Sequence, residues 1–115
     1  MSIPFRAPDR REQLFGGQGA VLVESLRGAL CAPFTAALHC ELAPAGQVGA
    51  HVQQSDSEII VGLEGEAVLY VDDRPHPVTP GAVVALPFGS QLAIDNASVD
   101  APFRYLIIKA TPAAR

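Results

Sequence analysis

The sequence lacks the features that would assign it to several large classes of protein. It has no run of lysine or arginine and a formal net charge of −4, so we expect neither nucleic acid nor anionic membranes as partners. No apolar stretch approaches the roughly 20 residues that span a bilayer. The first 17 residues hold no continuous apolar segment, so they do not resemble a signal peptide, and we expect a cytoplasmic protein.

Cysteine is scarce, with Cys31 and Cys40 as the two residues of this type. Two cysteines can form a disulfide, but the missing export signal favours reduced thiols. There is no CxxC pair or Cys/His cluster, which argues against a zinc finger. We therefore expect both cysteines to be small buried apolar residues.

What the sequence does contain is typical of an all-β domain. Its 115 residues fit one core, and 49% apolar against 17% charged residues favour a folded chain. Ten glycines and ten prolines are spread between short apolar runs rich in Val, Ile and Leu, which predicts many short strands in a sandwich or barrel. The predicted strands cover residues 20–26, 34–42, 50–53, 58–63, 66–71, 82–86, 92–95 and 103–111. Residues 10–15 and 24–30 are the candidates for single helical turns. We expect an N-terminal arm (1–19) and a barrel domain (20–115).

The turn residues support the strand boundaries. Asp72 and Asp73 predict a hairpin connection within residues 71–76. Pro80 and Gly81 stand in the order that a type II turn prefers. Gly65 lies between two predicted strands, where a positive φ costs glycine little.

Alternation along two strands predicts that each has two largely apolar faces. In residues 58–64 the even positions oppose the odd ones, and in residues 103–109 Phe103, Tyr105 and Ile107 oppose Arg104, Leu106 and Ile108. One face would line the barrel interior. The other needs cover from the N-terminal segment, another sheet or a second subunit, so we expect a homodimer.

The stretch GAHVQQSDSE, residues 49–58, holds the candidate site. His51 and Gln53 are two residues apart and share a face of a strand, and Glu58 returns on the next strand after a polar turn. A cluster of one imidazole, one amide and one carboxylate is a candidate metal site. It is also a candidate set of hydrogen-bonding groups around an organic ligand, or a satisfied polar network.

Other polar residues are weaker candidates. His39 shares a face with Ala37 and Glu41, and we interpret it as a surface or interface residue rather than a pocket residue. We expect His76 and Gln54 to be exposed. Neither Ser55 nor Ser57 is convincingly paired with a base as a nucleophile. The glycines of FGGQG, residues 15–19, lack the Lys-Ser/Thr pair of a phosphate-binding loop.

Two sets of spaced residues resemble the motifs of the cupin superfamily. The first motif, G(X)5HXH(X)3–4E(X)6G, is matched by Gly46 one residue short, and by His51, Glu58 and Gly65, with Gln53 in place of the second histidine. The second motif, G(X)5PXG(X)2H(X)3N, is matched by Gly81, Pro87, Gly89 and Asn96, with Leu92 in place of histidine. The resemblance covers about residues 36–109.

This resemblance implies an all-β, double-stranded β-helix (jelly-roll) barrel with a small-molecule pocket. Cupins that bind metal use two histidines, a glutamate and a third histidine, so it implies a divalent ion such as Zn, Mn, Fe or Ni, weakly held by His51, Gln53 and Glu58, or no metal. With a metal bound, the resemblance implies an enzyme of the isomerase, dioxygenase or lyase type. The alternatives are a metal-free ligand-binding or sensory module, with a pocket lined by Leu92, Ile60, Ile94 and Tyr105, and an accessory dimer without pocket chemistry. The fold does not decide among them.

Overall fold

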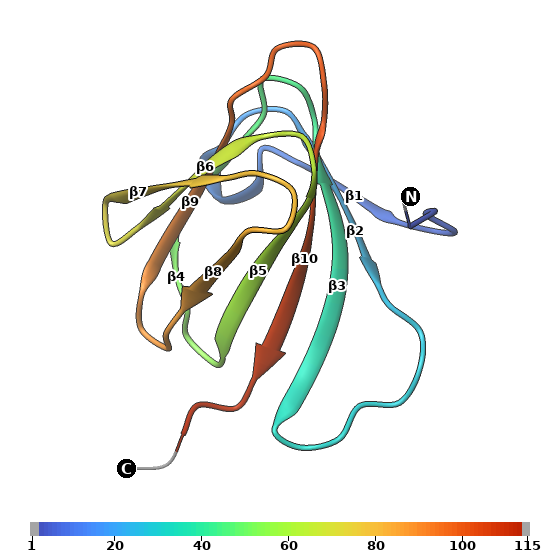
Figure 1. Ribbon diagram of the computed structural model, residues 1–115, viewed down its shortest axis with the longest axis vertical. Coiled ribbons are helices and arrows are strands. Elements are labelled where there is room, and N and C mark those ends of the chain that lie inside the picture. The colour runs from blue at the N-terminus through green and yellow to red at the C-terminus, as the bar shows by residue number, and fades with distance from the viewer. Residues whose placement is uncertain (1–2, 114–115) are drawn as a thin grey trace.

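The protein is a two-sheet β-barrel, seen in a computed structural model that describes residues 3–113 (Figure 1). The larger antiparallel sheet has the strand order β1-β2-β3-β10-β5-β8, and the smaller has the order β4-β9-β6-β7. The strands are β1 (Asp9–Glu12), β2 (Ala20–Ser25), β3 (Phe34–Leu42), β4 (Gln47–Val52), β5 (Ser57–Glu64), β6 (Ala67–Val71), β7 (Arg74–Val78), β8 (Val83–Leu86), β9 (Gln91–Asn96) and β10 (Phe103–Ala110). A 3-10 turn, η1 (Leu14–Gly16), follows β1. The predicted all-β jelly-roll fold is confirmed.

All eight predicted strands are present, and two further strands were missed. The connection predicted for residues 71–76 is only two residues long, because Asp72 and Asp73 have positive φ angles of 49° and 66° and Arg74 already pairs with Val71. Strand β7 therefore carries Pro75 and Pro77, which its position at the edge of the smaller sheet tolerates.

Neither predicted helical turn forms an α-helix. Residues 9–12 instead pair with β2 as the edge strand β1, and only Leu14–Gly16 adopts a 3-10 turn. Residues 24–30 divide between the end of β2 and a loop. The N-terminal residues thus join the larger sheet, so backbone pairing attaches the predicted arm to the barrel.

The predicted inner and outer faces are observed. On β5, Glu58, Ile60 and Gly62 are buried while Ile59 is exposed. The core between the sheets contains residues that are at most 2% exposed, among them Val21, Cys40, Leu42, Leu69, Leu92, Ile94, Phe103 and Tyr105. Asn96 supports a turn at this core, since its amide donates to the carbonyls of Leu42, Ala43 and Ala101.

The two cysteines differ in environment and are free within the described part of the chain. Cys40 is buried between the sheets, as expected. Cys31 is exposed in the loop before β3, so the expectation that it is buried was wrong. Burial raises the pKa of the Cys40 thiol to about 12, so this thiol behaves as a small apolar residue at neutral pH.

The outer face of the larger sheet is covered in part by the N-terminal segment. Phe5 stacks on His39 with 4.2 Å between ring centroids, and the Arg104 guanidinium lies over the same Phe5 ring. Glu24 on β2 accepts hydrogen bonds from the backbone N–H groups of Arg6 and Ala7. His39 is therefore only 1% exposed, which corrects its interpretation as a surface residue.

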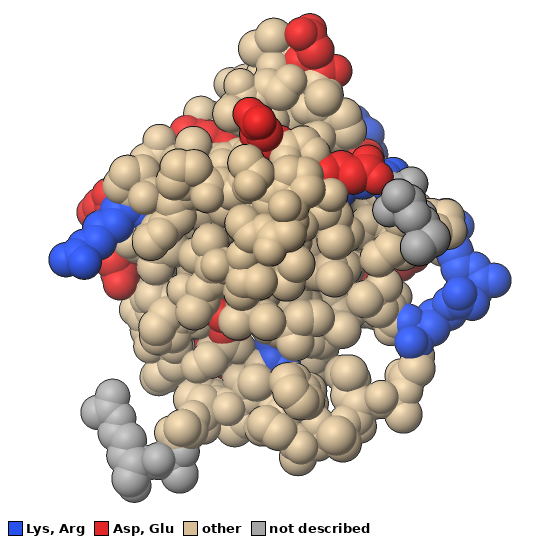
Figure 2. Space-filling view, in the orientation of Figure 1, with Lys and Arg blue, Asp and Glu red and all other residues tan. Residues whose placement is uncertain are grey.

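Other parts of the outer surface remain apolar and open. Ile59 and Val83 are exposed on the neighbouring strands β5 and β8. Figure 2 shows a face on which charged side chains lie mainly toward the rim and most of the surface is uncharged. Homodimerisation stays a prediction. Within residues 3–113 no helix combines the length and hydropathy needed to cross a membrane.

The buried His39 predicts a pH-dependent stability. Neither of its ring nitrogens has a hydrogen-bond partner among the described residues. Burial lowers its pKa below the usual 6.5, and Arg104 lowers it further against the opposing carboxylates Glu24 and Glu41. Because the folded state disfavours the imidazolium, the unfolded chain takes up this proton first as the pH falls below 6.5. The folded protein should therefore lose stability between that pH and the lowered pKa.

We expect His39→Leu to raise the free energy of unfolding by about 1 kcal/mol at about pH 8, since it removes unsatisfied buried polar atoms. Urea denaturation at about pH 8 and about pH 5 measures the free energy of unfolding of both proteins. The difference between variant and parent in this free energy should be larger at the lower pH. His76→Leu is the matched control, because His76 is exposed. A gap that stays constant or narrows would show that His39 is not protonated on unfolding.

Candidate functional site

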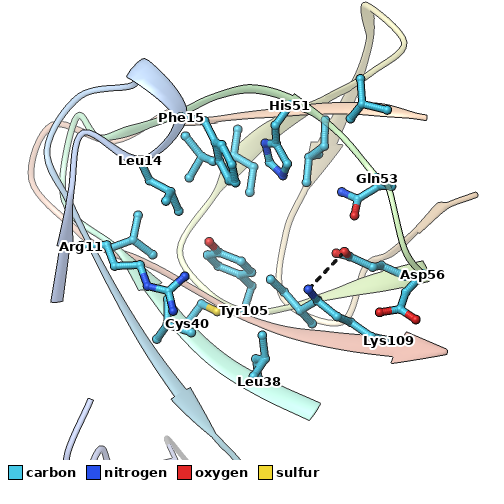
Figure 3. A pocket seen from close by; sticks show the side chains of 18 of the residues that line it. Arg11, Leu14, Phe15, Leu38, Cys40, His51, Gln53, Asp56, Tyr105 and Lys109 are labelled. Atoms are coloured by element: carbon cyan, nitrogen blue, oxygen red, sulfur yellow. Dashed lines mark ion pairs between the residues drawn. The ribbon is translucent and has the colours of Figure 1, made fainter. Parts of the chain in front are cut away.

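A cavity of about 550 Å³ opens at one end of the barrel between the two sheets. Its apolar floor comes from both sheets and includes Val21, Val23, Leu38, Val48, Leu92 and Ile94. Its polar lining includes Arg11, His51, Gln53, Asp56, Glu58 and Lys109. Figure 3 shows the polar groups Gln53, Asp56 and Lys109 at one side of the cavity, and Leu14, Phe15 and Arg11 at the other.

A β-bulge aims His51 into this cavity. The pairing of β4 with β9 shifts register between Val48, opposite Ile94, and His51, opposite Leu92. Residues three apart on a regular strand face opposite ways, but the extra residue here lets both Val48 and His51 line the cavity. The His51 Nδ1 lies 3.0 Å from the carbonyl oxygen of Gly49 in the bulge. With Nδ1–H donating to that carbonyl, Nε2 keeps its lone pair.

The 3-10 turn η1 covers one side of the His51 ring. Phe15 stacks on His51 with 3.8 Å between centroids and an angle of 13° between planes. This approach requires glycines, since a Cβ on Gly17 would collide with the Gln47 carbonyl and one on Gly49 with the Phe15 carbonyl. The FGGQG stretch, residues 15–19, is therefore a packing element beside His51, a contact that was not predicted from the sequence. Phe15 beside closely spaced glycines was the available signal.

Gln53 and Glu58 line the same cavity as His51 but come from different sheets. Gln53 directly follows β4 of the smaller sheet, whereas Glu58 lies on β5 of the larger sheet. Gln53 is 6% exposed, and its Nε2 has no hydrogen-bond partner within residues 3–113. Glu58 is 7% exposed. Burial raises the pKa of the Glu58 carboxyl, while the nearby Lys109 and His51 act in the opposite direction.

Lys109 is the functional candidate that the sequence analysis missed. It is the single lysine of the chain, and it follows Phe103, Tyr105 and Ile107 on the inner face of β10. The register of β10 with β5 places Lys109 directly opposite Glu58, and the Lys109 Nζ lies 3.7 Å from the Glu58 Oε2 (Figure 3). The signal was present, since the same alternation that placed Tyr105 and Ile107 inside extends to residue 109.

The remaining predicted site residues divide between cavity and core. Leu92, Ile94 and Tyr105 line the cavity. Ile60 is fully buried and lies outside the set of lining residues. Burial raises the pKa of the Tyr105 hydroxyl well above its usual value, so Tyr105 stays a neutral donor and acceptor at this wall.

The residues considered weaker candidates lie mostly elsewhere. His39 is outside the cavity, and His76 is exposed on β7 as expected. Gln54, also exposed as expected, and Ser55 lie at the cavity lining. The Ser57 hydroxyl accepts a hydrogen bond from the backbone N–H of Phe88, which gives it a structural partner rather than a base.

His51, Gln53 and Glu58 are a poor donor set for a metal ion, because the Gln53 amide is a weaker ligand than imidazole. The described residues bring together no group of three His, Cys, Asp or Glu side chains that could hold an ion. Leu92, which offers no lone pair, stands directly across from His51. The Glu58 carboxylate already faces the Lys109 ammonium, which would repel a divalent cation at the same oxygens. A cationic side chain thus occupies the neighbourhood in which a metal would have to sit.

The comparison with known protein families agrees with the all-β fold. Residues 38–109, more than half of the chain, match the family described as Cupin domain. The chain belongs to the cupin family. A comparison with curated protein sequences gave no match.

Solved structures show the same barrel. A predicted oxalate decarboxylase from Thermotoga maritima superposes with a TM-score of 0.82 at 24% identity, covering 90% of this chain and 91% of that one. A Cupin 2 conserved barrel domain protein from Salinispora arenicola gives 0.67 at 27% identity, covering 78% and 75%. KdgF from Halomonas sp. gives 0.70 at 10% identity, covering 91% and 87%. At 24% and 10% identity, the Thermotoga maritima and Halomonas sp. structures show only that this chain has the same fold.

The donor set predicts a metal content that elemental analysis can measure. Protein purified without chelator should hold less than about a tenth of an equivalent of Zn, Mn, Fe or Ni. The double variant Q53H/L92H adds two imidazoles beside His51 on the smaller sheet, which makes three zinc ligands that do not depend on Glu58, so it should bind close to one equivalent of zinc. Stoichiometric metal in the parent protein would contradict the assignment, and Leu92→Met serves as a control that adds no imidazole.

Proposed function

We propose that this cupin is a ligand-binding protein that holds a small organic molecule in its barrel cavity without a metal ion. The observation that carries the proposal is the Gln53 amide, which is buried at the cavity wall with an Nε2 donor unsatisfied by the described residues. A buried donor without a partner costs free energy comparable to a lost hydrogen bond. An acceptor atom on a bound molecule would satisfy it.

The rest of the cavity supports an amphipathic molecule. A volume of about 550 Å³ falls within the range of small-molecule sites. The floor of Val, Leu and Ile side chains would cover an apolar body, and Phe15 and Tyr105 add aromatic surface. His51 contributes an Nε2 lone pair that can accept a hydrogen bond.

A second function, metal-independent proton transfer, is favoured by one specific observation. Burial raises the pKa of Glu58 toward neutral pH, and His51 interacts with this carboxyl electrostatically. A carboxyl group with a raised pKa can exchange protons with a bound molecule, as isomerase or lyase chemistry requires. Proton transfer is the second candidate function, because Glu58 and His51 can equally serve as hydrogen-bonding groups for a bound ligand. The predicted homodimer and cytoplasmic location belong to either function as predictions.

A thermal-shift screen of metabolites, followed by calorimetry on the best stabiliser, tests the proposal. We expect Gln53→Ala to weaken its binding by about tenfold, because the amide hydrogen bond is lost at a buried site. Gln91→Ala is the matched control, since Gln91 precedes the inward-facing Leu92 on β9 and faces outward. A screen without any stabiliser, or equal binding by both variants, would count against a ligand at this wall.

A further inference from the structure

Lys109 occupies a position that the apolar interior alone does not explain. Three inward-facing residues precede it on β10, and all are apolar or aromatic. Its side chain is 33% exposed, whereas that of Glu58 opposite is 6% exposed. Glu58 is therefore the buried member of the pair, and Lys109 is the more accessible of these two cavity-lining side chains.

The ion pair leaves the ammonium with donors to offer. The 3.7 Å between the Lys109 Nζ and the Glu58 Oε2 exceeds the length of a hydrogen bond between charged groups, about 2.7–2.9 Å. An ammonium carries three N–H donors. The Glu58 carboxylate thus compensates the charge of Lys109 without saturating its hydrogen bonding.

A second unsatisfied donor lies on the same side of the cavity. The Gln53 Nε2 has no partner in the described part of the chain, and Figure 3 shows Gln53 and Lys109 on that side. Phe15 and Leu14 lie on the opposite side of the cavity. The cavity therefore offers donors to acceptor atoms at one end of a ligand and apolar contact to its other end.

From this arrangement we propose that the ligand is a small monocarboxylate with an apolar body. Its carboxylate accepts hydrogen bonds from the Lys109 ammonium and the Gln53 amide. The assignment rests on the proposed binding function and adds the chemical class of the ligand. Lys109 then supplies the positive charge at this wall that an ion would otherwise supply.

The charges around the cavity disfavour more than one negative charge on the ligand. Two cationic residues, Arg11 and Lys109, and two acidic residues, Asp56 and Glu58, line it. A monoanion at Lys109 shares this cation with Glu58 and meets less repulsion from the two carboxylates than a phosphate dianion would. Arg11 is the alternative anchor. It lies on the other side of the cavity (Figure 3), and its side chain is half exposed. One guanidinium nitrogen of Arg11 lies 3.8 Å from the Asp9 Oδ2.

Calorimetric titration with matched probes tests the assignment. The acids are 4-methylpentanoate, phenylacetate and 3-phenylpropanoate, and the neutral partners are the primary alcohols of the same carbon skeletons. We expect at least one acid to bind at least about tenfold more tightly than its alcohol, which is the effect of one charge-assisted hydrogen bond. Lys109→Met should remove this preference, and Lys109→Arg should keep most of it.

Two further variants separate binding from folding. Lys109→Met leaves Glu58 buried without its cation, so the double variant K109M/E58Q removes both charges and should fold while losing the acid preference. Arg74→Met removes an exposed cation on β7 and is the control for net charge. It should retain the preference.

Each contrary outcome has a distinct meaning. Acids and alcohols that bind parent protein equally would overturn the carboxylate assignment and leave the ligand-binding function standing. An acid preference that survives in K109M/E58Q, or that disappears in Arg11→Met instead, would overturn the role of Lys109. Failure of all probes together with an empty metabolite screen would overturn the binding function as well.

Discussion

The register between β10 and β5 is the constraint on which the site depends. β10 is hydrogen-bonded to β3 on one side and β5 on the other, so its inner face forms the centre of the larger sheet. Pairing Lys109 with Glu58 sets a cation against a buried carboxylate at the cavity wall. A shift by one residue would turn Lys109 outward and leave Glu58 buried without a counter-charge. The same register that completes the barrel therefore fixes the charge of the cavity.

That pairing separates this chain from the metal-binding pattern its motifs resemble. His51 and Glu58 keep two of the ligand positions, but Leu92 faces His51 across the β4–β9 pair and Lys109 faces Glu58. We therefore infer that the polar side chains of the cavity form hydrogen bonds to a ligand rather than coordinate a metal ion. Phe15, stacked on His51, narrows the approach to the imidazole from the side of η1. These contacts favour the binding of a small organic ligand over metal catalysis, and proton transfer is the second candidate function.

Sequence patterns predicted most of the fold and part of the site. Alternation and turn residues located eight strands because those signals are local. Strand β7 was missed because Pro75 and Pro77 suggest a loop, and only its edge position permits them. The burial of His39 depends on Phe5, which lies far away in sequence, and the Lys109–Glu58 contact depends on strand register. Pairwise contacts between distant segments leave no periodic signal in a single sequence.

We infer that Lys109, and not a metal ion, is the cationic centre of the cavity. Because the chain has one lysine, protein labelled with 13C-lysine gives a single Cε resonance that reports on this site alone. We predict that the resonance shifts and saturates on titration with the monocarboxylate probe that binds, and that one equivalent of Mn²⁺ leaves it sharp. A resonance that does not shift with any of the carboxylates, and that stoichiometric Mn²⁺ broadens, would place the ion in the cavity. That result would contradict the role of Lys109 as the cationic centre.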